Sequence, residues 1–191
     1  MAAVEPRRAQ LASGNAHKLE ELRAALPGWE IELLRADGFP DEDGETYYEN
    51  ARDKARFGRE VAEPGTWILG EDSGIEAAAL GGRPGVASAR WAEDGVAQLL
   101  VELDSARDRR ARYVCELVAL APDGGERRGT GILEGTIATE RRGDGGFGYD
   151  PIFVPAGEER TVAELGNAWK SSNSHRARAA VALLRSISDT P

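Results

Sequence analysis

The sequence has 191 residues, of which 41% are hydrophobic and 30% charged, which is ordinary for a globular protein long enough to bury a core. The net charge of −9 at pH 7 argues against a nucleic-acid-binding surface, and no apolar run approaches the ~20 residues of a membrane span. Cys115 is the only cysteine, which excludes an intrachain disulfide and indicates a reducing cytoplasm. We expect residues 1–8 to be a flexible tail and residues 9–191 to be one cytoplasmic domain, with no nucleic-acid or membrane partner.

Lysine is rare in this chain. Of the 24 basic residues, 21 are arginine and only Lys18, Lys54 and Lys170 are lysine. Each of the three falls within a motif described below. Lysine presents a compact charge that suits phosphate, so this distribution favours a site for a small anionic ligand, although chance could also produce it.

The first motif follows a short strand predicted over residues 10–12. A small polar turn over residues 13–18 precedes a helical pattern that ends at Pro27-Gly28. The backbone N–H groups at such a helix start, with the charge of Lys18, form a natural anion site. The turn lacks the Walker A spacing, and an ordinary N-cap by Ser13 or Asn15 explains it equally well.

An acidic loop over residues 41–46 separates a strand predicted over residues 30–34 from a helix predicted over residues 46–62. Asn50 and Lys54 share one face of this helix because they are four residues apart. The acidic loop could be solvated or could serve the helix dipole. Alternatively, Glu42 provides a second carboxylate for a metal ion.

The other carboxylate would come from the segment Thr66–Ile75. Residues 67–69 form an apolar strand pattern that is predicted to stop at Gly70, with Ser73-Gly74 as a tight turn. Asp72 at the end of a buried strand could hold magnesium or accept a proton from water. Considered alone, the segment is more typical of a surface turn.

The middle of the chain supplies further predicted elements. These are a glycine-rich loop over residues 80–86, a helix over 95–103, a solvated basic connector over 107–112, a central strand over 113–121 and a second long strand over 128–139. Gly131 and Gly135 in the last strand suggest close approach by another backbone or a ligand.

A glycine-rich loop over residues 143–151 formally contains the G-x-G-x-x-G spacing. Pro151 and the lack of a following helical pattern exclude a dinucleotide-binding motif. The loop presents Phe147, which could stack on a base or anchor the loop in the core.

The last predicted helix begins after Ser174, a plausible N-cap, so that His175 and Arg176 fall in its first turn. Cations are unfavourable at this end of a helix dipole. This placement suggests that they serve a ligand.

Taken together, these segments resemble the inosine/xanthosine triphosphate pyrophosphatases, which clear non-standard purine nucleotides. The resemblance covers nearly the whole chain and rests on six motifs in order. They are Ser13-Gly-Asn-x-x-Lys18, Glu42-x-Gly-x-Thr-x-x-Glu-Asn50-Ala-x-x-Lys54-Ala, Glu71-Asp-Ser-Gly74, Leu80-Gly-Gly-x-Pro-Gly-Val-x-Ser-Ala-Arg90, Gly146-Phe-Gly-Tyr-Asp-Pro151, and Ala163-Glu-Leu165 with Lys170 and Ser174-His-Arg176.

The resemblance implies an α/β fold with a long mixed central β-sheet flanked by helices, two lobes around a nucleotide-binding cleft, and a homodimer. It implies magnesium-dependent hydrolysis of ITP, dITP or XTP to the monophosphate and pyrophosphate. Glu42 and Asp72 would hold Mg²⁺, Asp72 would also be the proton acceptor, and Lys54 would add charge at the phosphates. The implied substrate-binding residues are Ser13, Gly14, Asn15, Ala16, His17, Lys18, Ser73, Phe147, Gly148, Tyr149, Asp150, Lys170, His175 and Arg176.

One departure from the family pattern concerns Glu71, where the family commonly has aspartate, so its role as metal ligand or supporting contact is open. Two rival functions also stay open. One is a pyrophosphatase for pyrimidine or modified nucleotides, which the base-lining residues argue against. The other is a nucleotide sensor that does not hydrolyse, which Glu42 and Asp72 argue against.

Overall fold

A computed structural model describes residues 6–189, which form two compact units. The first unit comprises the chain up to Asp72, Cys115–Gly131 and the residues from Arg176 onward, and the second comprises Ser73–Val114 and Ile132–His175. The first strand begins at Arg7, so residues 7–8 belong to a strand rather than to the predicted tail. Residues 1–5 of that tail and residues 190–191 lie outside the described part. The single domain over residues 9–191 stays a prediction beside these two units.

The strands form a sheet in the order β2-β1-β3-β4-β5-β6. Their bounds are β1 Arg7–Leu11, β2 Trp29–Leu33, β3 Trp67–Ala77, β4 Arg110–Leu120, β5 Glu126–Ile137 and β6 Phe153–Pro155. Strand β1 pairs in parallel with β2 and β3, whereas β5 and β6 are antiparallel. The predicted mixed sheet flanked by helices is therefore confirmed.

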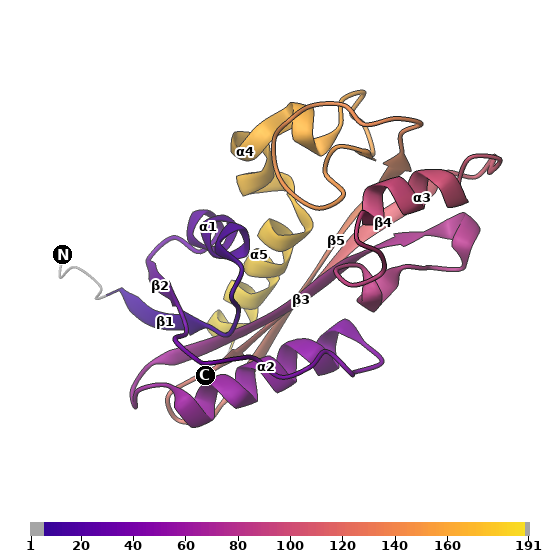
Figure 1. The fold of residues 1–191 in the computed structure, drawn as a ribbon. Coiled ribbons are helices and arrows are strands. Elements are labelled where there is room, and N and C mark those ends of the chain that lie inside the picture. Colours follow the sequence, from indigo (N-terminus) through magenta and orange to yellow (C-terminus); the bar gives the residue numbers. More distant parts are fainter. Residues whose placement is uncertain (1–5, 190–191) are drawn as a thin grey trace. The chain divides into compact units, whose positions relative to one another are not determined.

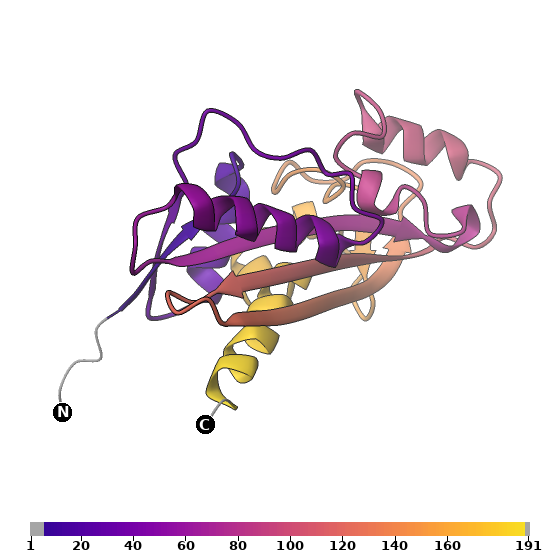
Figure 2. The same ribbon diagram turned by 90° about the horizontal axis from the view of Figure 1, so that it is seen from below.

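In the first unit, helices cover both faces of the strands. Helices α1 (Ala16–Ala25) and α5 (His175–Ser188) pack on the face that carries Leu69 and Leu117. Helix α2 (Tyr47–Val61) packs on the face that carries Ile68 and Val118 (Figures 1 and 2). The two clusters take alternate residues of the same strands because successive side chains of a strand point to opposite faces.

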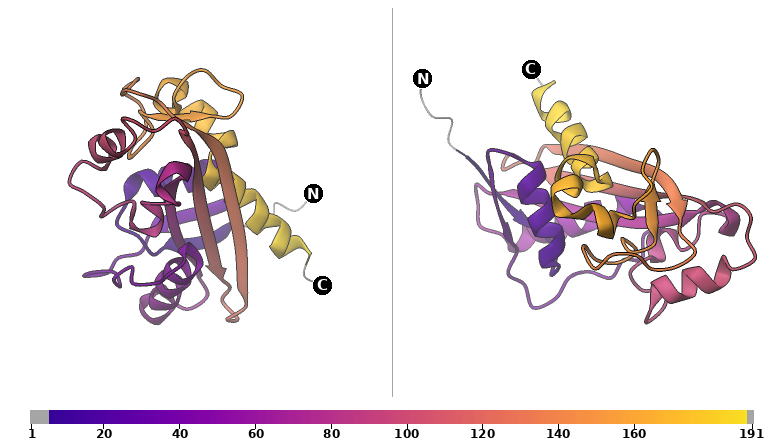
Figure 3. Two further views of the ribbon diagram at one scale, coloured as in Figure 1. Left: turned by 90° about the vertical axis from the view of Figure 1, so that its right-hand side faces the viewer. Right: turned by 90° about the horizontal axis from the view of Figure 1, so that it is seen from above.

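Two glycines allow helices to approach these strands closely. A Cβ atom on Gly70 of β3 would lie 1.9 Å from the Ala51 carbonyl oxygen of α2. A Cβ atom on Gly129 of β5 would lie 2.1 Å from the Ala179 carbonyl oxygen of α5, which runs alongside β5 in Figure 3. Glycine is therefore required at both positions for packing.

The predicted stop at Gly70 and the turn at Ser73-Gly74 are wrong. Strand β3 runs without interruption from Trp67 to Ala77, and Glu71 and Asp72 lie inside it. Gly70 marks the contact with α2 rather than a strand end. The two carboxylates can lie within a buried strand because cations from the surrounding helices pair with them, as described below.

The predicted solvated connector over residues 107–112 is wrong in its second half, because β4 begins at Arg110. Arg110 and Arg112 are exposed, while Ala111 and Tyr113 are buried in the second unit's core. The basic residues are thus the exposed positions of an alternating strand.

The second unit contains the helices α3 (Gly95–Glu102) and α4 (Val162–Asn173) and two short 3₁₀ helices, Ala78–Leu80 and Gly85–Ala87. Gly135 of β5 allows the backbone of β6 to approach closely, as predicted. A Cβ atom there would lie 2.3 Å from the Val154 carbonyl oxygen of β6. Among residues 6–189, no helix has the length and apolar character needed to cross a membrane.

Candidate active site

Glu71 and Asp72 are neighbours in the sequence but face opposite sides of β3. Glu71 lies two positions after Leu69 and shares its face of the strand, which packs against α1 and α5. Asp72 lies two positions after Gly70 and shares the opposite face, which packs against α2. The two carboxylate groups therefore pair with side chains of different helices.

Glu71 is the centre of a buried ion-pair cluster. Its side chain is fully buried, 2.7 Å from the Lys18 ammonium of α1 and 2.8 Å from Nη2 of Arg176 in α5. Nε of Arg176 donates a second hydrogen bond to Glu71 at 3.0 Å, and Nη1 donates to Glu21 at 2.6 Å. Burial acts to raise the pKa of Glu71, but the charges of Arg176, Lys18 and Lys54 hold this pKa well below its ordinary value.

This cluster accounts for the glutamate that departs from the family pattern. Its two carboxylate oxygens reach both Lys18 of α1 and Arg176 of α5, which lies 105 positions later in the sequence. Cys115 lies against the same carboxylate at 3.5 Å and is buried, which raises the pKa of its thiol well above the usual value. Glu71 thus holds α1 and α5 to β3 through charge pairing.

Asp72 is surrounded by α2 and by the acidic loop before it. Its Oδ2 accepts a hydrogen bond from the Asn50 amide at 3.0 Å, and its Oδ1 lies 3.3 Å from the Lys54 ammonium. Burial is the largest cause that raises the pKa of Asp72, and the charges of Glu42 and Glu71 raise it further, against the opposing effects of Lys54 and Asn50. A carboxylate with a raised pKa is suited to accept a proton.

Lys54 joins Asp72 to the acidic loop. Its ammonium also contacts the Glu42 carboxylate and donates to the Glu71 carbonyl oxygen at 3.1 Å. Burial alone would lower the pKa of Lys54, but Asp72, Glu71 and Glu42 raise it, so this lysine stays charged. Glu42 and Asp72 thus both contact one ammonium group, and their role as metal ligands stays a prediction.

The start of α2 fixes the position of these side chains. Thr46 and Glu49 form a reciprocal capping box at its first turn. Asn50 and Lys54 then point the same way from successive turns, as their spacing predicted.

The turn over residues 13–18 follows the carboxyl end of β1. This end lies next to the part of β3 that leads into Glu71 and Asp72. Leu11 of β1 pairs with Leu69 of β3, and the chain leaves β1 toward β2 on one side and returns to β3 on the other. Ligands bind at such a switch point in open α/β sheets because the loops diverge there. Asn15 is the N-cap of α1, accepting hydrogen bonds from the N–H groups of His17 at 2.9 Å and Lys18 at 3.3 Å.

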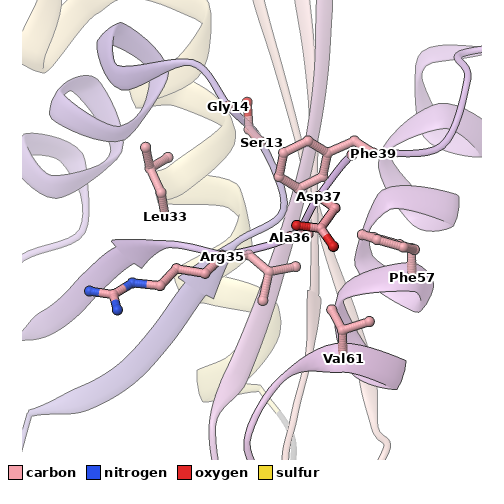
Figure 4. A pocket seen from close by; sticks show the side chains of 11 residues that line it. Ser13, Gly14, Leu33, Arg35, Ala36, Asp37, Phe39, Phe57 and Val61 are labelled. Atoms are coloured by element: carbon pink, nitrogen blue, oxygen red, sulfur yellow. The ribbon is translucent and has the colours of Figure 1, made fainter.

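A pocket of about 840 Å³ opens beside this turn (Figure 4). Phe39 and Phe57 line it and form an edge-to-face pair with ring centroids 6.0 Å apart. The complete lining consists of Ser13, Gly14, Leu33, Leu34, Arg35, Ala36, Asp37, Gly38, Phe39, Phe57 and Val61. Apart from Ser13 and Gly14, none of these residues was predicted to lie beside a site.

In the second unit, Asp150 organises the glycine-rich loop. Its Oδ2 lies 2.7 Å from the Lys170 ammonium and accepts the backbone N–H of Phe147 at 2.9 Å, while Tyr113 donates to its Oδ1 at 3.2 Å. The Lys170 ammonium also lies over the Phe147 ring, 4.6 Å from its centroid. Gly146 has a φ of +74°, and a Cβ there would lie 2.1 Å from Asp150.

The aromatic residues of this loop have different environments. Tyr149 is buried in the second unit's core and donates to the Ser88 carbonyl oxygen at 2.9 Å, and burial raises its pKa to about 12. Phe147 is only half-buried and lies outside that core cluster. Tyr149 is thus the anchor of the loop, and Phe147 keeps a partly accessible ring.

The remaining predicted residues are distributed as follows. His175 is buried and its ring stacks on Tyr113 with centroids 4.5 Å apart, and Ser174 is buried between α4 and α5. Ser73 is half-buried in β3, His17 is exposed, and Gly148 has a φ of +60°. Arg176, predicted to contact substrate, is only 2% exposed and pairs with Glu71 and Glu21.

Sequence reasoning missed Glu21 and Tyr113, which organise these sites, and it gave Asn50 no role beyond sharing a helix face with Lys54. The spacing of Asn50 from Lys54 was a usable signal, because it placed the amide beside a predicted phosphate ligand. Glu21 and Tyr113 gave no such signal, since their partners Arg176 and Asp150 are distant in sequence.

Within residues 6–189, no group of three or more His, Cys, Asp or Glu side chains is arranged to hold a metal ion. Glu42 and Asp72 nevertheless converge on one ammonium group, which shows that a cation is accommodated between them. One or two carboxylates suffice for Mg²⁺ when phosphate oxygens and water complete its shell, so the pair fits this ion.

The sequence is similar to those of known proteins. The family model described as the Ham1 family matches residues 9–186. The dITP/XTP pyrophosphatase of Deinococcus radiodurans is 42% identical over 185 residues, covering 93% of this chain and 92% of that protein. The dITP/XTP pyrophosphatase of Symbiobacterium thermophilum is 45% identical over 184 residues, covering 91% of each chain.

A solved structure gives the same result for the fold. The Ham1 protein of Staphylococcus aureus superimposes with a TM-score of 0.81 at 32% identity, covering 96% of this chain and 98% of that one. Because sequence motifs, family model and fold agree over almost the whole length, the chain belongs to the Ham1 family.

Proposed function

We propose that this chain is a nucleoside triphosphate pyrophosphatase that hydrolyses dITP, ITP and XTP to the monophosphate and pyrophosphate. Relatives more than 40% identical over most of the chain are dITP/XTP pyrophosphatases. The observation that carries the proposal is Asp72, a buried carboxylate with a raised pKa, held between the Asn50 amide and the Lys54 ammonium. Removing non-standard triphosphates in this way keeps them out of DNA and RNA.

The triphosphate is assigned to the switch point at the carboxyl end of β1, beside the middle of β3. The N-terminus of α1 carries partial positive charge that favours phosphate. The turn residues Ser13–Lys18 adjoin it, and Lys54 adds a second ammonium on the opposite face of β3. Together these groups neutralise charge that spreads over the phosphate oxygens.

Glu42 and Asp72 are the residues that would hold Mg²⁺, with the substrate's phosphates completing its shell. When bound there, Mg²⁺ supplies Lewis-acid stabilisation of the phosphate oxygens. Lys54 contacts both carboxylates and would donate to phosphate oxygens beside them.

Asp72 is assigned as the proton acceptor. As the oxygen of a water molecule bonds to phosphorus, its proton passes to the Asp72 carboxylate, and the α–β anhydride bond breaks to release pyrophosphate. The raised pKa of Asp72 increases its basicity, while Asn50 and Lys54 fix its orientation. Glu71 is unsuited to this role because the charges of Arg176, Lys18 and Lys54 hold its pKa low.

The base is assigned to the second unit's loop. Phe147 presents a half-buried ring beneath the Lys170 ammonium, an arrangement on which a purine can stack. Asp150 and Tyr149 hold the loop, and Gly148, Ser73, His175 and Arg176 stay predicted substrate contacts. His175 and Arg176 would donate hydrogen bonds to the 6-oxo oxygen of a purine. They would disfavour adenine, whose 6-amino group is itself a donor.

The proposal extends to the assembly and its location. We assign the chain as a cytoplasmic homodimer that acts on free nucleotides rather than on nucleic acid. The lone reduced cysteine supports the reducing compartment, and the net charge of −9 opposes binding to polyanions.

The test is pyrophosphate release with Mg²⁺ from ITP, dITP, XTP, GTP, ATP and dTTP in parallel. We expect the first three to be cleaved far faster than GTP and ATP, and Asp72→Asn to lower kcat at least about 100-fold while retaining the fold. Faster cleavage of dTTP would indicate a pyrimidine enzyme. Binding without cleavage by the wild type would indicate a sensor and refute the proposed activity.

A further inference from the structure

Asn50 orients Asp72 in the proposed chemistry, and its second contact connects it to the loop that carries Glu42, the other predicted metal-binding carboxylate. It is 3% exposed and lies in the first turns of α2. One side of its amide faces the loop that carries Glu42, and the other side faces Asp72 in β3. A single side chain therefore contacts both structural elements that supply carboxylates.

The orientation of the amide follows from its partners. The Asn50 Oδ1 accepts the backbone N–H of Gly44 at 2.8 Å, and a backbone N–H can only donate. The NH₂ group must then face Asp72, where it donates to Oδ2 at 3.0 Å. An ionised carboxylate accepts hydrogen bonds and cannot donate them. Both hydrogen bonds of Asn50 therefore have a donor and an acceptor only in this one orientation of the amide.

The local backbone is built to maintain this contact. A Cβ atom on Gly44 would lie 2.6 Å from the Asn50 Oδ1, so glycine is needed for the loop to approach. The capping box of Thr46 and Glu49 fixes the first turn from which Asn50 projects. The hydrogen bond to Oδ2 leaves Oδ1 of Asp72 on the side of Lys54 and Glu42.

We propose that Asn50 is a positioning residue that sets the distance and orientation of Glu42 and Asp72 for divalent-cation binding. This inference rests on the proposed function, in which those two carboxylates hold the ion. Asn50 itself contacts neither the ion nor the substrate. It acts by fixing one oxygen of Asp72 and, through Gly44, the backbone two residues after Glu42.

The experiment compares Asn50→Ala and Asn50→Asp with the wild type. Mn²⁺ binding is measured without substrate by electron paramagnetic resonance, alongside kcat and KM for ITP. We expect Asn50→Ala to weaken Mn²⁺ binding about tenfold or more, because both carboxylates lose their fixed positions, and to lower kcat about 100-fold. Wild-type Mn²⁺ binding in Asn50→Ala would overturn the inference.

Asn50→Asp preserves the size and the acceptor for Gly44 but places a third carboxylate beside Asp72. We expect Mn²⁺ binding at least as tight as in the wild type, combined with a loss of kcat, because the added charge attracts cations while Asp72 loses its donor. Wild-type kcat in this variant would also overturn the inference. The variant covers the case in which Asn50→Ala fails to fold.

Thr46→Ala is the matched structural control. It removes the α2 cap and lowers stability, but leaves both Asn50 hydrogen-bond partners in place. We expect its Mn²⁺ affinity to stay within about threefold of wild type when measured well below its Tm. An equal loss in Thr46→Ala would show that Asn50 acts only through helix stability. A wild type that neither binds Mn²⁺ nor cleaves ITP would instead refute the proposed function.

Discussion

The buried carboxylate of Glu71 offers the sharpest test of how the first unit is held together. In Glu71→Gln the side chain keeps its size but loses its charge. Its new NH₂ group must face either Lys18 or Arg176, both of which only donate. Lys18 and Arg176, whose side chains are 16% and 2% exposed, then lose their shared counter-ion.

The size of the effect follows from the burial. Removing one partner of a buried, hydrogen-bonded ion pair costs about 3–5 kcal/mol. Arg176 loses Glu71 in this variant but keeps its pairing with Glu21. For a chain of this length, each kcal/mol lowers Tm by about 2–4 °C. We therefore expect Glu71→Gln to lower Tm by about 6–20 °C.

Equilibrium urea unfolding at pH 7 measures the loss in free energy of unfolding, and thermal unfolding measures the Tm shift. Glu76→Gln is the control. Glu76 pairs with Arg112 at 2.7 Å, but the Arg112 side chain is 45% exposed, so we expect its loss to cost less than about 1 kcal/mol. Equal effects of the two substitutions, or a loss below about 1 kcal/mol in Glu71→Gln, would refute the argument that Glu71 holds the helices by charge pairing.

The pH dependence provides a second readout. The folded state lowers the pKa of Glu71, so its contribution is fully present above the pKa of an unfolded glutamate and disappears as pH falls through the lower folded pKa. Wild-type stability should therefore fall more steeply on acidification than that of Glu71→Gln. Parallel acid profiles would contradict a charged Glu71 in the folded state.

Three further substitutions test other parts of the structure. Gly70→Ala should destabilise by about 3 kcal/mol or more, measured by urea unfolding, because its Cβ would lie 1.9 Å from the Ala51 carbonyl oxygen; a near-neutral result would contradict this packing. Phe147→Ala should raise KM for ITP about tenfold or more with a smaller change in kcat, if the ring stacks on the base; an unchanged KM in steady-state kinetics would remove Phe147 from the site. Tyr149→Phe should lower stability by about 1 kcal/mol through loss of its hydrogen bond to Ser88, with KM nearly unchanged; a large rise in KM would show that the hydroxyl contacts substrate.

The motifs allowed much of the fold to be predicted, because helices and strands follow from local patterns. The capped helix containing Asn50 and Lys54 and the turn capped by Asn15 depend on residues within a few positions of one another. Turn-forming residue types led to a wrong prediction where tertiary contacts decide the backbone conformation. Gly70 and Ser73-Gly74 indicate a turn locally, yet β3 continues through them because α2 packs directly on Gly70.

The sequence by itself determined which residue types are available: a phosphate-type turn, acidic side chains, three lysines in motifs and a glycine-rich aromatic loop. Only the tertiary structure decided their separate roles. Strand geometry turns Glu71 toward α1 and α5 and Asp72 toward α2, so one is neutralised by cations while the other acquires a raised pKa. Arg176 likewise pairs with residues more than 100 positions earlier. A pKa depends on burial and on charges nearby in space, which sequence spacing does not specify.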